Sequence, residues 1–373
     1  MLSKYHMSEW KTYRAEDFCL TVTDGTHDSP KPQPSGRYLI TSKHLKSFEI
    51  DFSSANKITE EDYNKIIQRS KVEQYDILFS MIGTIGNIHR VTIPNVDFAV
   101  KNMGIFKMGG DAAKSLWMYY WLQSPEAKEY INSRITGSTQ GYLTLKSLRD
   151  FPVRVPPLAE QKRIADILSA IDDKIELNRR INANLEQQAQ ALYKSWFVDA
   201  DTTGWGTKKL ADFFNVITGK KDANYSTKDG VYPFFTCSQD ILKAPNYSFE
   251  GAAILLAGNG DFNVKRYIGK FEAYQRTYVL IPFEKRYHSF LYLLIKYHLQ
   301  EITGGSRGSV IKFITKGNIA DFTFTMPPYS IDEKLSLFDS LFNEIDKNIT
   351  EINNLSTIRD TLLPKLMSGE IKV

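Results

Sequence analysis

Two polar loops at matched positions carry side chains that can hydrogen-bond to nucleic acid. Residues 138–142 read Ser-Thr-Gln-Gly-Tyr, and residues 306–309 read Ser-Arg-Gly-Ser. In the major groove of DNA a glutamine amide pairs with adenine and an arginine guanidinium with guanine, whereas hydroxyls and backbone amides bind phosphates. The two loops therefore predict a DNA-binding surface with one loop in each half of the chain.

Further basic and polar residues follow turn signals in both halves. Singly, each of them is more often an ordinary surface residue, and His27, beside Asp24 and Gly25, is typical of a polar loop. Their occurrence in corresponding pairs favours a binding face. The candidate DNA-contacting residues are Thr26, His27, Arg90, Lys101, Ser138, Thr139, Gln140, Tyr142, Lys220, Lys221, Lys265, Arg266, Arg276, Ser306 and Arg307.

The sequence contains no self-contained catalytic site. Met326-Pro327-Pro328-Tyr329 resembles the Asn/Asp-Pro-Pro-Tyr motif of amino-group methyltransferases, but a methionine thioether is too weak an acceptor to hold a target amine. Its repeat partner, Val155-Pro156-Pro157, has no polar side chain. Proline favours the first turn of a helix, and the residue before it favours extended backbone. Both double prolines are therefore predicted to end a strand and begin a helix.

Other catalytic and metal-binding patterns are missing from the sequence. Gly258-Asn259-Gly260 lacks the third glycine of a dinucleotide fingerprint and is predicted to be a turn. The six histidines and two cysteines have no metal-ligand spacing, so neither a metal nor a catalytic residue is predicted. The widely separated Cys19 and Cys237 are typical of a reducing compartment.

The amino-acid composition limits the class of protein and the number of domains. The chain has 373 residues, a net charge of +4, 42% hydrophobic and 24% charged residues, values that are ordinary for globular proteins. It shows no apolar run long enough for a membrane span and no signal peptide at its start. We therefore expect a cytoplasmic protein without a membrane partner, large enough for two or three domains.

Two stretches predict long helices. Apolar residues alternate steps of four and three from Ile164 to Trp196, and again from Leu335 through Ile349 to Ile352; Ile358 and Leu366 continue the second pattern less regularly. This is the heptad seam of a coiled coil. Asn178 and Asn182 fall on the first seam, where they could set the register of packing; a solvated helix face is the alternative.

The chain is predicted to contain an internal duplication. Val22-Thr23-Asp24-Gly25 corresponds to Val216-Ile217-Thr218-Gly219, and residues 135–141 correspond to 302–308. The predicted organisation is a domain at 1–155, a helix at 156–200, a second domain at 201–327 and a second helix at 328–373. The fold class is α+β: two similar domains separated by two long antiparallel coiled-coil helices, with pseudo-twofold symmetry.

These features resemble the specificity (S) subunits of type I restriction–modification systems over the whole chain. The segments that carry the resemblance are Gly137-Ser138-Thr139-Gln140, Pro156-Pro157-Leu158-Ala159-Glu160-Gln161-Lys162-Arg163, Ile171-Asp172-Asp173-Lys174-Ile175, Leu192-Tyr193-Lys194-Ser195-Trp196-Phe197 and Leu363-Pro364-Lys365-Leu366-Met367-Ser368-Gly369.

The resemblance implies a chain without catalysis of its own. Each domain would be a target-recognition domain for half of a split site in double-stranded DNA. The helices would space the halves and dock two modification subunits, which carry S-adenosylmethionine and methylate adenine. Restriction subunits would join that core. Two alternatives are a degenerate methyltransferase, which would itself bind S-adenosylmethionine, and a coiled-coil scaffold that binds only proteins.

Overall fold

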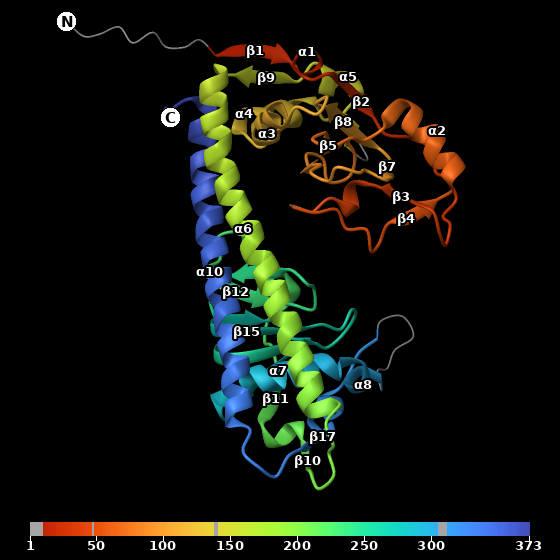
Figure 1. Ribbon diagram of the computed structural model, residues 1–373. Helices are drawn as coiled ribbons and strands as arrows, with labels where there is room; N and C mark the ends of the chain where they lie inside the picture. The colour runs from red at the N-terminus through yellow and green to blue at the C-terminus, as the bar shows by residue number, and fades with distance from the viewer. Residues whose placement is uncertain (1–9, 47, 138–140, 305–311) are drawn as a thin grey trace, which may run out of the picture. The chain divides into compact units, whose positions relative to one another are not determined.

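The computed structural model describes residues 10–46, 48–137, 141–304 and 312–373, which form two compact units (Figure 1). Unit 1 comprises Met1–Leu177 and Glu351–Val373, and unit 2 comprises Asn178–Thr350. The long helices α6 (Leu158–Tyr193) and α10 (Asp332–Ser368) each contribute one part to either unit. This division differs from the four predicted segments, because contacts group part of each long helix with the sheets of one unit.

Unit 1 contains two sheets and a two-stranded ribbon. The larger sheet has the order β2-β8-β5-β6 with antiparallel pairing, and the smaller has the order β4-β3-β7 with a parallel β3–β7 pair; β1 pairs with β9. The strands are β1 (Lys11–Arg14), β2 (Thr21–Asp24), β3 (Arg37–Ile40), β4 (Asn56–Ile58), β5 (Ile77–Ser80), β6 (Ile88–Arg90), β7 (Phe98–Val100), β8 (Met103–Lys107) and β9 (Pro152–Val155), and the helices are α1 (Ala15–Phe18), α2 (Glu60–Ser70), α3 (Ala112–Trp121), α4 (Pro125–Arg134) and α5 (Leu145–Arg149).

The main core of unit 1 joins its larger sheet to the helices. Phe79 and Phe106 of the sheet pack with Trp117 of α3 and with Leu168 of α6 and Leu366 of α10. Burial of such side chains contributes roughly 1.5–3 kcal/mol each. The larger sheet of unit 1 and its portion of the helix pair therefore share one core.

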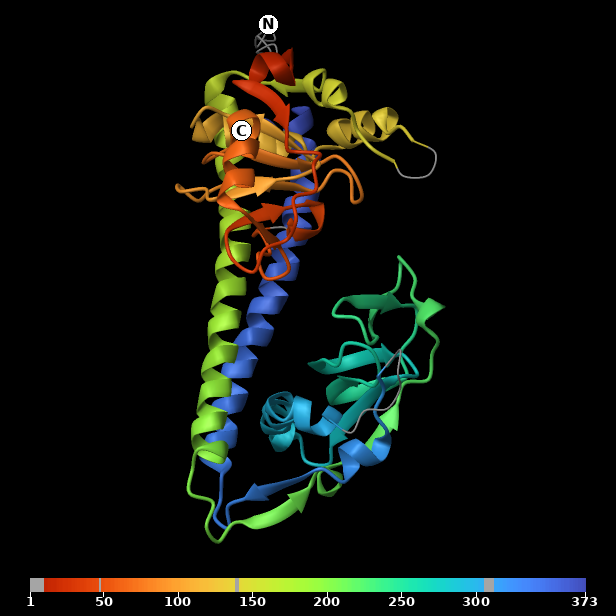
Figure 2. The same cartoon turned by 90° about the vertical axis from the view of Figure 1, so that its right-hand side faces the viewer.

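The described residues of unit 2 form a six-stranded sheet of order β11-β16-β14-β15-β12-β13 and the ribbon β10–β17 (Figure 2). Its core joins Ile254 and Leu280 of the sheet, Phe290 of α7, and Phe338 and Phe342 of α10. The strands are β10 (Gly206–Lys209), β11 (Phe214–Thr218), β12 (Tyr232–Phe235), β13 (Ile241–Ala244), β14 (Phe249–Ala257), β15 (Val264–Ala273), β16 (Thr277–Pro282) and β17 (Thr323–Met326), and the helices are α7 (His288–Tyr297), α8 (Leu299–Gly304) and α9 (Lys316–Ala320).

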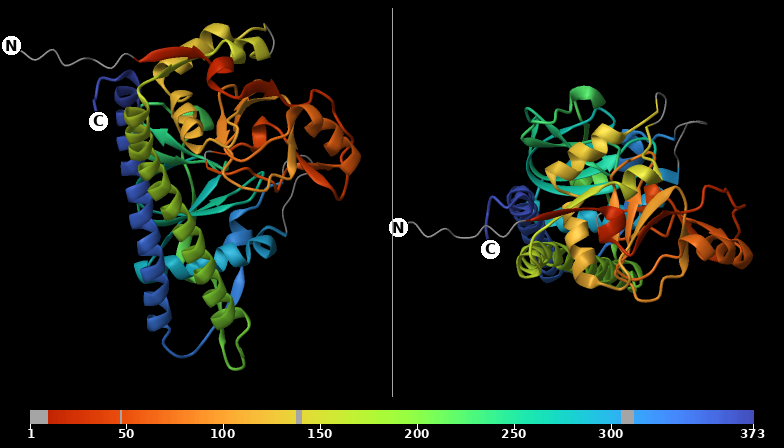
Figure 3. Two further views of the ribbon diagram at one scale, coloured as in Figure 1. Left: turned by 45° about the horizontal axis from the view of Figure 1, so that its top comes forward. Right: turned by 90° about the horizontal axis from the view of Figure 1, so that it is seen from above.

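The two units repeat one topology, which confirms the predicted duplication. β2-β8-β5 of unit 1 corresponds to β11-β16-β14 of unit 2, and β3-β4 corresponds to β12-β13. The single long β15 takes the places of β6 and β7, and it therefore joins the two parts into one sheet. Helix α2, beside the smaller sheet of unit 1 (Figure 3), has no counterpart among the described helices of unit 2. The fold class is α+β, as predicted.

The helices pair antiparallel within each unit. In unit 1 the side chain of Asp172 accepts from Arg359 at 2.9 Å, and Lys174 lies 3.5 Å from Glu351. In unit 2 Asn348 donates to Asn182 at 2.9 Å, and the ring of Trp196, just after α6, lies 5.6 Å from that of Phe338. Partners thus run in opposite directions along the two helices.

The buried seam follows the predicted positions in α6 but departs from them in α10. Ile164, Leu168 and Ile175 are buried as expected. Ile349 and Ile358 are exposed, so their prediction as seam residues was wrong. Asn348, one residue before Ile349, is buried in its place, because the seam advances by three residues from Ile345 rather than by four.

Candidate nucleic-acid interface

In unit 1 two turns meet beside the end of β2. The amide of Gly25 donates to the Met103 carbonyl at 2.8 Å, and that of Thr26 donates to Val100 at 3.0 Å. A Cβ atom on Gly25 would lie 2.3 Å from the Val100 oxygen. Only glycine allows so close a backbone approach, and it brings the segment after β2 against Lys101 and Asn102.

Side chains on these turns form one polar cluster. His27 places Nε2 2.9 Å from the Asp24 carboxylate and Nδ1 2.9 Å from the Asn102 amide oxygen. Lys101 donates to the Ser29 hydroxyl. Thr26 is buried, and its hydroxyl accepts from the Asp28 amide. The structure thus brings together three of the predicted residues, Thr26, His27 and Lys101.

A further basic residue in the cluster was missed by the sequence analysis. Arg69, in the last turn of α2, lies 3.3 Å from the Asp24 carboxylate and donates to the Gly25 carbonyl at 3.1 Å. Its guanidinium remains largely exposed. No local pattern marks Arg69, because its proximity to Gly25 depends on the packing of α2.

Unit 2 repeats this arrangement of turns. Gly219 donates to the Thr277 carbonyl at 2.9 Å, and a Cβ atom there would lie 2.2 Å from the Ala273 oxygen. Lys221 forms a parallel bridge with Tyr274, as Thr26 does with Lys101. The two units therefore share a glycine contact that joins the turn after β2 or β11 to the turn before β8 or β16.

The turn residues of unit 2 are basic and polar. Lys220 lies over the ring of Phe249 at 5.9 Å, and Lys221 lies over that of Tyr225 at 4.5 Å. Gln275 donates to Asp222 at 2.6 Å, and the neighbouring Arg276 is exposed. Lys220, Lys221 and Arg276 are thus brought together as predicted residues, and Gln275 joins them.

The residues that follow the two loops of Gln140 and Arg307 are held at equivalent positions in the two units. Ser138, Thr139, Gln140, Ser306 and Arg307 lie outside the described residues. Their flanks are described: the Leu143 amide donates to Met81 at 2.9 Å, and that of Ile314 donates to Gly258 at 3.1 Å. Met81 follows β5 and Gly258 follows β14, so each loop returns to the same turn of its unit. The exposed Tyr142 closes the first loop through paired hydrogen bonds with Thr136.

Two predicted residues, Arg90 and Arg266, occupy equivalent positions away from these turns. Arg90 pairs with Ile77 in β5, and Arg266 pairs with Ile254 in β14. Arg266 forms a bidentate ion pair with Asp346 of α10 at 2.8 and 3.0 Å, over the ring of Phe342. Both terminal nitrogens of Arg266 are therefore engaged within the protein, and we do not assign this residue to a DNA surface.

Arg90 is likewise directed inward. Its Nε donates to Ser115 at 3.0 Å, and its guanidinium lies 5.0 Å from the centroid of the Tyr75 ring. Burial lowers the pKa of Arg90, and nearby tyrosines and Asp173 oppose that effect. It lines a cavity of about 250 Å³ together with Asp172 and Asp173 of α6. Arg90 therefore belongs to the contact between sheet and helix, as Arg266 does.

The charged group of Lys265 is also engaged by contacts within the protein. Its Nζ donates to the Ser238 carbonyl at 2.6 Å and to the Asn263 side chain at 2.5 Å. Desolvation by burial lowers the pKa of this lysine. These contacts hold the loop after β12 against β15, which is a structural role.

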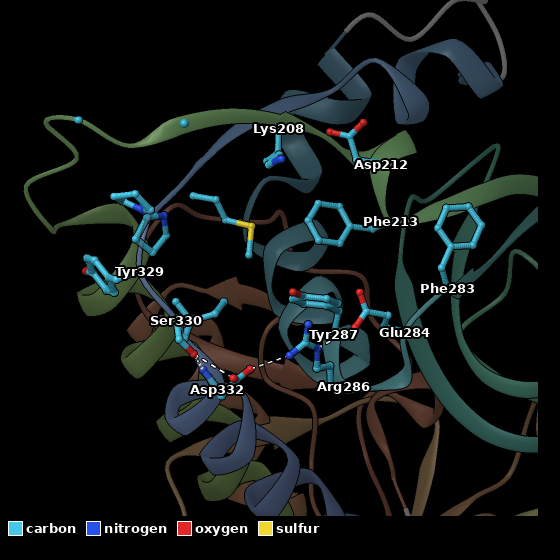
Figure 4. A pocket seen from close by; sticks show the side chains of 16 residues that line it. Lys208, Asp212, Phe213, Phe283, Glu284, Arg286, Tyr287, Tyr329, Ser330 and Asp332 are labelled. Carbon is cyan, nitrogen blue, oxygen red and sulfur yellow. Dashed lines mark hydrogen bonds and ion pairs between the residues drawn. The ribbon is translucent and has the colours of Figure 1, made fainter.

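The methyltransferase-like motif lines a pocket of about 740 Å³ in unit 2 (Figure 4). Met326 ends β17 and Asp332 begins α10, so Pro327 and Pro328 connect strand to helix as predicted. On one wall Arg286 bridges Glu284 and Asp332, both at 2.9 Å. The Met326 side chain at the first motif position offers only a thioether, which is a weak acceptor for an amine.

The described residues contain no group of three His, Cys, Asp or Glu side chains that could hold a metal ion. Among the described helices, none is both long and apolar enough to cross a membrane.

The profile of the type I restriction modification DNA specificity domain matches residues 7–187 and 202–355. These ranges cover most of the chain and include both recognition domains. The chain therefore belongs to this family of specificity subunits, which are distinct from the catalytic subunits of the same systems. The prediction of the family from the sequence is confirmed.

Individual relatives are similar over different lengths. The EcoDI specificity subunit of Escherichia coli is 39% identical over 175 residues, which cover 45% of this chain and 38% of that protein. The MjaIX specificity subunit of Methanocaldococcus jannaschii is 26% identical over 386 residues, 90% of this chain and 86% of the relative. The match to the first relative thus spans less than half of either protein.

A solved structure shares the fold. The crystal structure of the S subunit from M. genitalium matches with a TM-score of 0.60 and 16% identity, covering 98% of both chains. At this identity the similarity extends to the fold alone.

Proposed function

We propose that this chain recognises a split site in double-stranded DNA, with one half read by each unit. The observation that carries the proposal is the repeated pair of turns. Gly25 joins Thr26 and His27 to Lys101, and Gly219 joins Lys220 and Lys221 to Gln275 and Arg276. The backbone arrangement of these turns is the same in both units, whereas their side chains differ. This is expected if the two units recognise different DNA sequences.

Two kinds of DNA contact follow from these side chains. Lys101, Lys220 and Lys221 are suited to phosphates, which position a protein without reading sequence. Gln140 and Arg307 have the side chains that read adenine and guanine. Both belong to loops anchored at equivalent turns, which supports the assignment of base reading to those loops.

The partners proposed are two modification subunits, which carry S-adenosylmethionine, and restriction subunits. Apolar side chains exposed on the helices support docking of proteins there: Ile167 and Leu177 in unit 1, and Ile181 and Ile349 in unit 2. No cofactor is assigned to this chain itself. The proposal places the complex in the cytoplasm, where it would meet chromosomal DNA.

The test is to map methylated adenines in cells with and without this chain, together with its modification subunit. We expect one bipartite sequence to be methylated only when the chain is present. Replacing residues 1–150 with the matching domain of a relative should change one half of that sequence and leave the other half intact. Methylation that does not depend on the chain would contradict the proposal, and a change in both halves would contradict independent reading.

A binding assay separates phosphate contacts from the alternatives. Lys221→Ala should weaken binding to all DNA sequences and lower the slope of log K against log salt by about 0.9. Lys209→Ala, which removes a lysine paired with Asp321 on the ribbon, is the matched control and should leave the slope unchanged.

A chain that binds no DNA within its complex would favour the protein-scaffold alternative. Methyl transfer by the purified chain alone would favour the degenerate methyltransferase.

A further inference from the structure

Two aspartates at equivalent places in the repeat tie the recognition domains to the long helices. Asp172 lies in Ile171-Asp172-Asp173-Lys174-Ile175 of α6, and Asp346 lies in Ile345-Asp346-Lys347-Asn348-Ile349 of α10. Each accepts hydrogen bonds from the recognition domain of its own unit. Tyr120 of α3 donates to Asp172 at 2.9 Å, and Arg266 of β15 donates to Asp346.

The contact in unit 2 constrains both distance and angle. Both terminal nitrogens of Arg266 bind the two oxygens of Asp346, at 2.8 and 3.0 Å. A bidentate pair of planar groups fixes their relative orientation as well as their separation. The Arg266 side chain is only 9% exposed, whereas that of Asp346 is 41% exposed. Since Arg266 lies on an inner strand of the sheet, its contact transmits this constraint to the whole sheet.

The contact in unit 1 uses different groups for the same purpose. Asp172 is buried and accepts from the Tyr120 hydroxyl and from Arg359 of α10, both at 2.9 Å. Burial raises the pKa of Tyr120, and the negative charge of Asp172 adds to this effect. The Tyr120 hydroxyl therefore stays neutral and can donate a hydrogen bond. Arg359 thereby joins α10 to the same carboxylate that holds α3.

Other contacts hold the domain of unit 2 on the helices in the absence of Arg266. Tyr292 of α7 donates to Glu186 of α6 at 2.6 Å, and Ser289 donates to Asp339 of α10 at 2.6 Å. The apolar core shared by α7 and α10 adds to them. Loss of the Arg266–Asp346 pair should therefore loosen the angle of the sheet without detaching the domain.

We propose that Asp172 and Asp346 are positioning residues that set the angle of each recognition domain on the helices of its own unit, and thereby restrict the spacer between the two halves of the DNA site. This inference rests on the proposed function. One extra base pair rotates a half-site by about 35° around the DNA axis, since a turn contains 10–10.5 base pairs. A recognition domain held at a fixed angle binds its half-site at one spacer length. A recognition domain that can rotate also binds its half-site when the spacer is one base pair shorter or longer.

The experiment uses the assembled modification complex and a library of sites whose spacers differ by one base pair. Arg266→Met retains the apolar stem over Phe342 and leaves Asp346 solvated. Methylation of sites one base pair shorter or longer should rise about tenfold relative to the original spacer, as expected for loss of a charge-assisted hydrogen bond. The sequences of both half-sites should stay the same. Arg266→Lys, which retains charge without the bidentate geometry, should give a smaller rise.

Two further variants complete the test. Lys209→Ala, which breaks a 3.0 Å ion pair with Asp321 inside the same recognition domain, should leave the spacer preference unchanged. Tyr120→Phe removes a single oxygen from the unit 1 contact and should also broaden the spacers; it decides the question if Arg266→Met reduces the folded fraction. An unchanged spacer preference in folded Arg266→Met or Tyr120→Phe would overturn the inference. Failure of the proposed function is distinguishable, because the unsubstituted complex would then show no bipartite site.

Discussion

Asn182 and Asn348 face each other across the helix pair of unit 2, with the Asn348 amide donating to the Asn182 oxygen at 2.9 Å. The Asn182 amide also points to the Ile345 carbonyl at 3.5 Å. A polar pair inside an apolar seam is satisfied only when the two residues are opposite each other, so it favours one register over others. The sequence analysis placed Asn182 on the seam without identifying its partner.

The asparagine pair makes a prediction about stability. Asn182→Leu alone should lower the free energy of unfolding by about 1–3 kcal/mol, because the Asn348 amide loses its partner. The double replacement Asn182→Leu and Asn348→Leu should recover that loss or exceed the original stability, since both polar groups are removed. Chemical denaturation of the four proteins in a double-mutant cycle measures the coupling. Additive losses in the two single variants would show that the pair is not coupled.

Acid should destabilise unit 2 through a buried histidine. His288 donates to the Ala253 carbonyl at 3.0 Å, and burial lowers its pKa to about 4. The unfolded chain, with a histidine pKa of about 6.5, binds a proton that the folded chain does not between these values. Stability should therefore fall as the pH drops from about 6.5 to 4, by up to about 1.4 kcal/mol per pH unit from this residue.

The matched variant for the acid effect is His288→Gln, which retains an amide donor without titrating. Its unfolding free energy, measured by denaturation between pH 7 and 4, should lose that part of the slope. His27→Gln changes an exposed histidine and serves as the control. Equal slopes in His288→Gln and the original protein would contradict the assignment.

Gln140 and Arg307 are predicted to read bases in different half-sites. Gln140→Ala should weaken binding by about 1–3 kcal/mol and relax specificity at one position of one half-site. Arg307→Ala should do the same in the other half. Competition binding with single-base variants of the site measures both effects. Uniform weakening across all sequences would instead indicate phosphate contacts, and unchanged binding would refute the placement of these loops.

The length of α6 is predicted to help set the spacer. Seven residues inserted near Asn182 preserve the heptad seam and add roughly 10 Å of helix. With a rise of about 3.4 Å per base pair, the ceiling is about three extra base pairs. The increase should be smaller, because α10 is not lengthened and each base pair also rotates a half-site. An insertion of two residues should turn the seam away from its partner and damage folding.

Methylation mapping in cells that express the seven-residue insertion measures the spacer directly. We expect both half-sites to keep their sequences and the distance between them to grow. A functional complex that still methylates the original spacer would show that α6 does not set the distance.

The sequence by itself determined the long helices, the duplication and the family. Heptad spacing is a local property, and the matched segments that end at Gly25 and Gly219 can be recognised in the sequence of each half. Side-chain matches such as Asp172 with Asp346 repeat in order along the chain, so the sequence alone reveals them. The family resemblance was carried by the same local segments.

Only the tertiary structure decided which basic side chains stay exposed and which are engaged in contacts within the protein. Adjacent residues on a strand point to opposite faces, so Lys265 and Arg266 cannot share one surface, and the sequence does not say which face meets the helices. Arg266 reaches Asp346 of a helix distant in sequence, while Arg69 comes to the Gly25 turn because α2 packs there. Such contacts depend on how separate elements pack. The sequence therefore does not show which residue a charged side chain will contact in the folded protein.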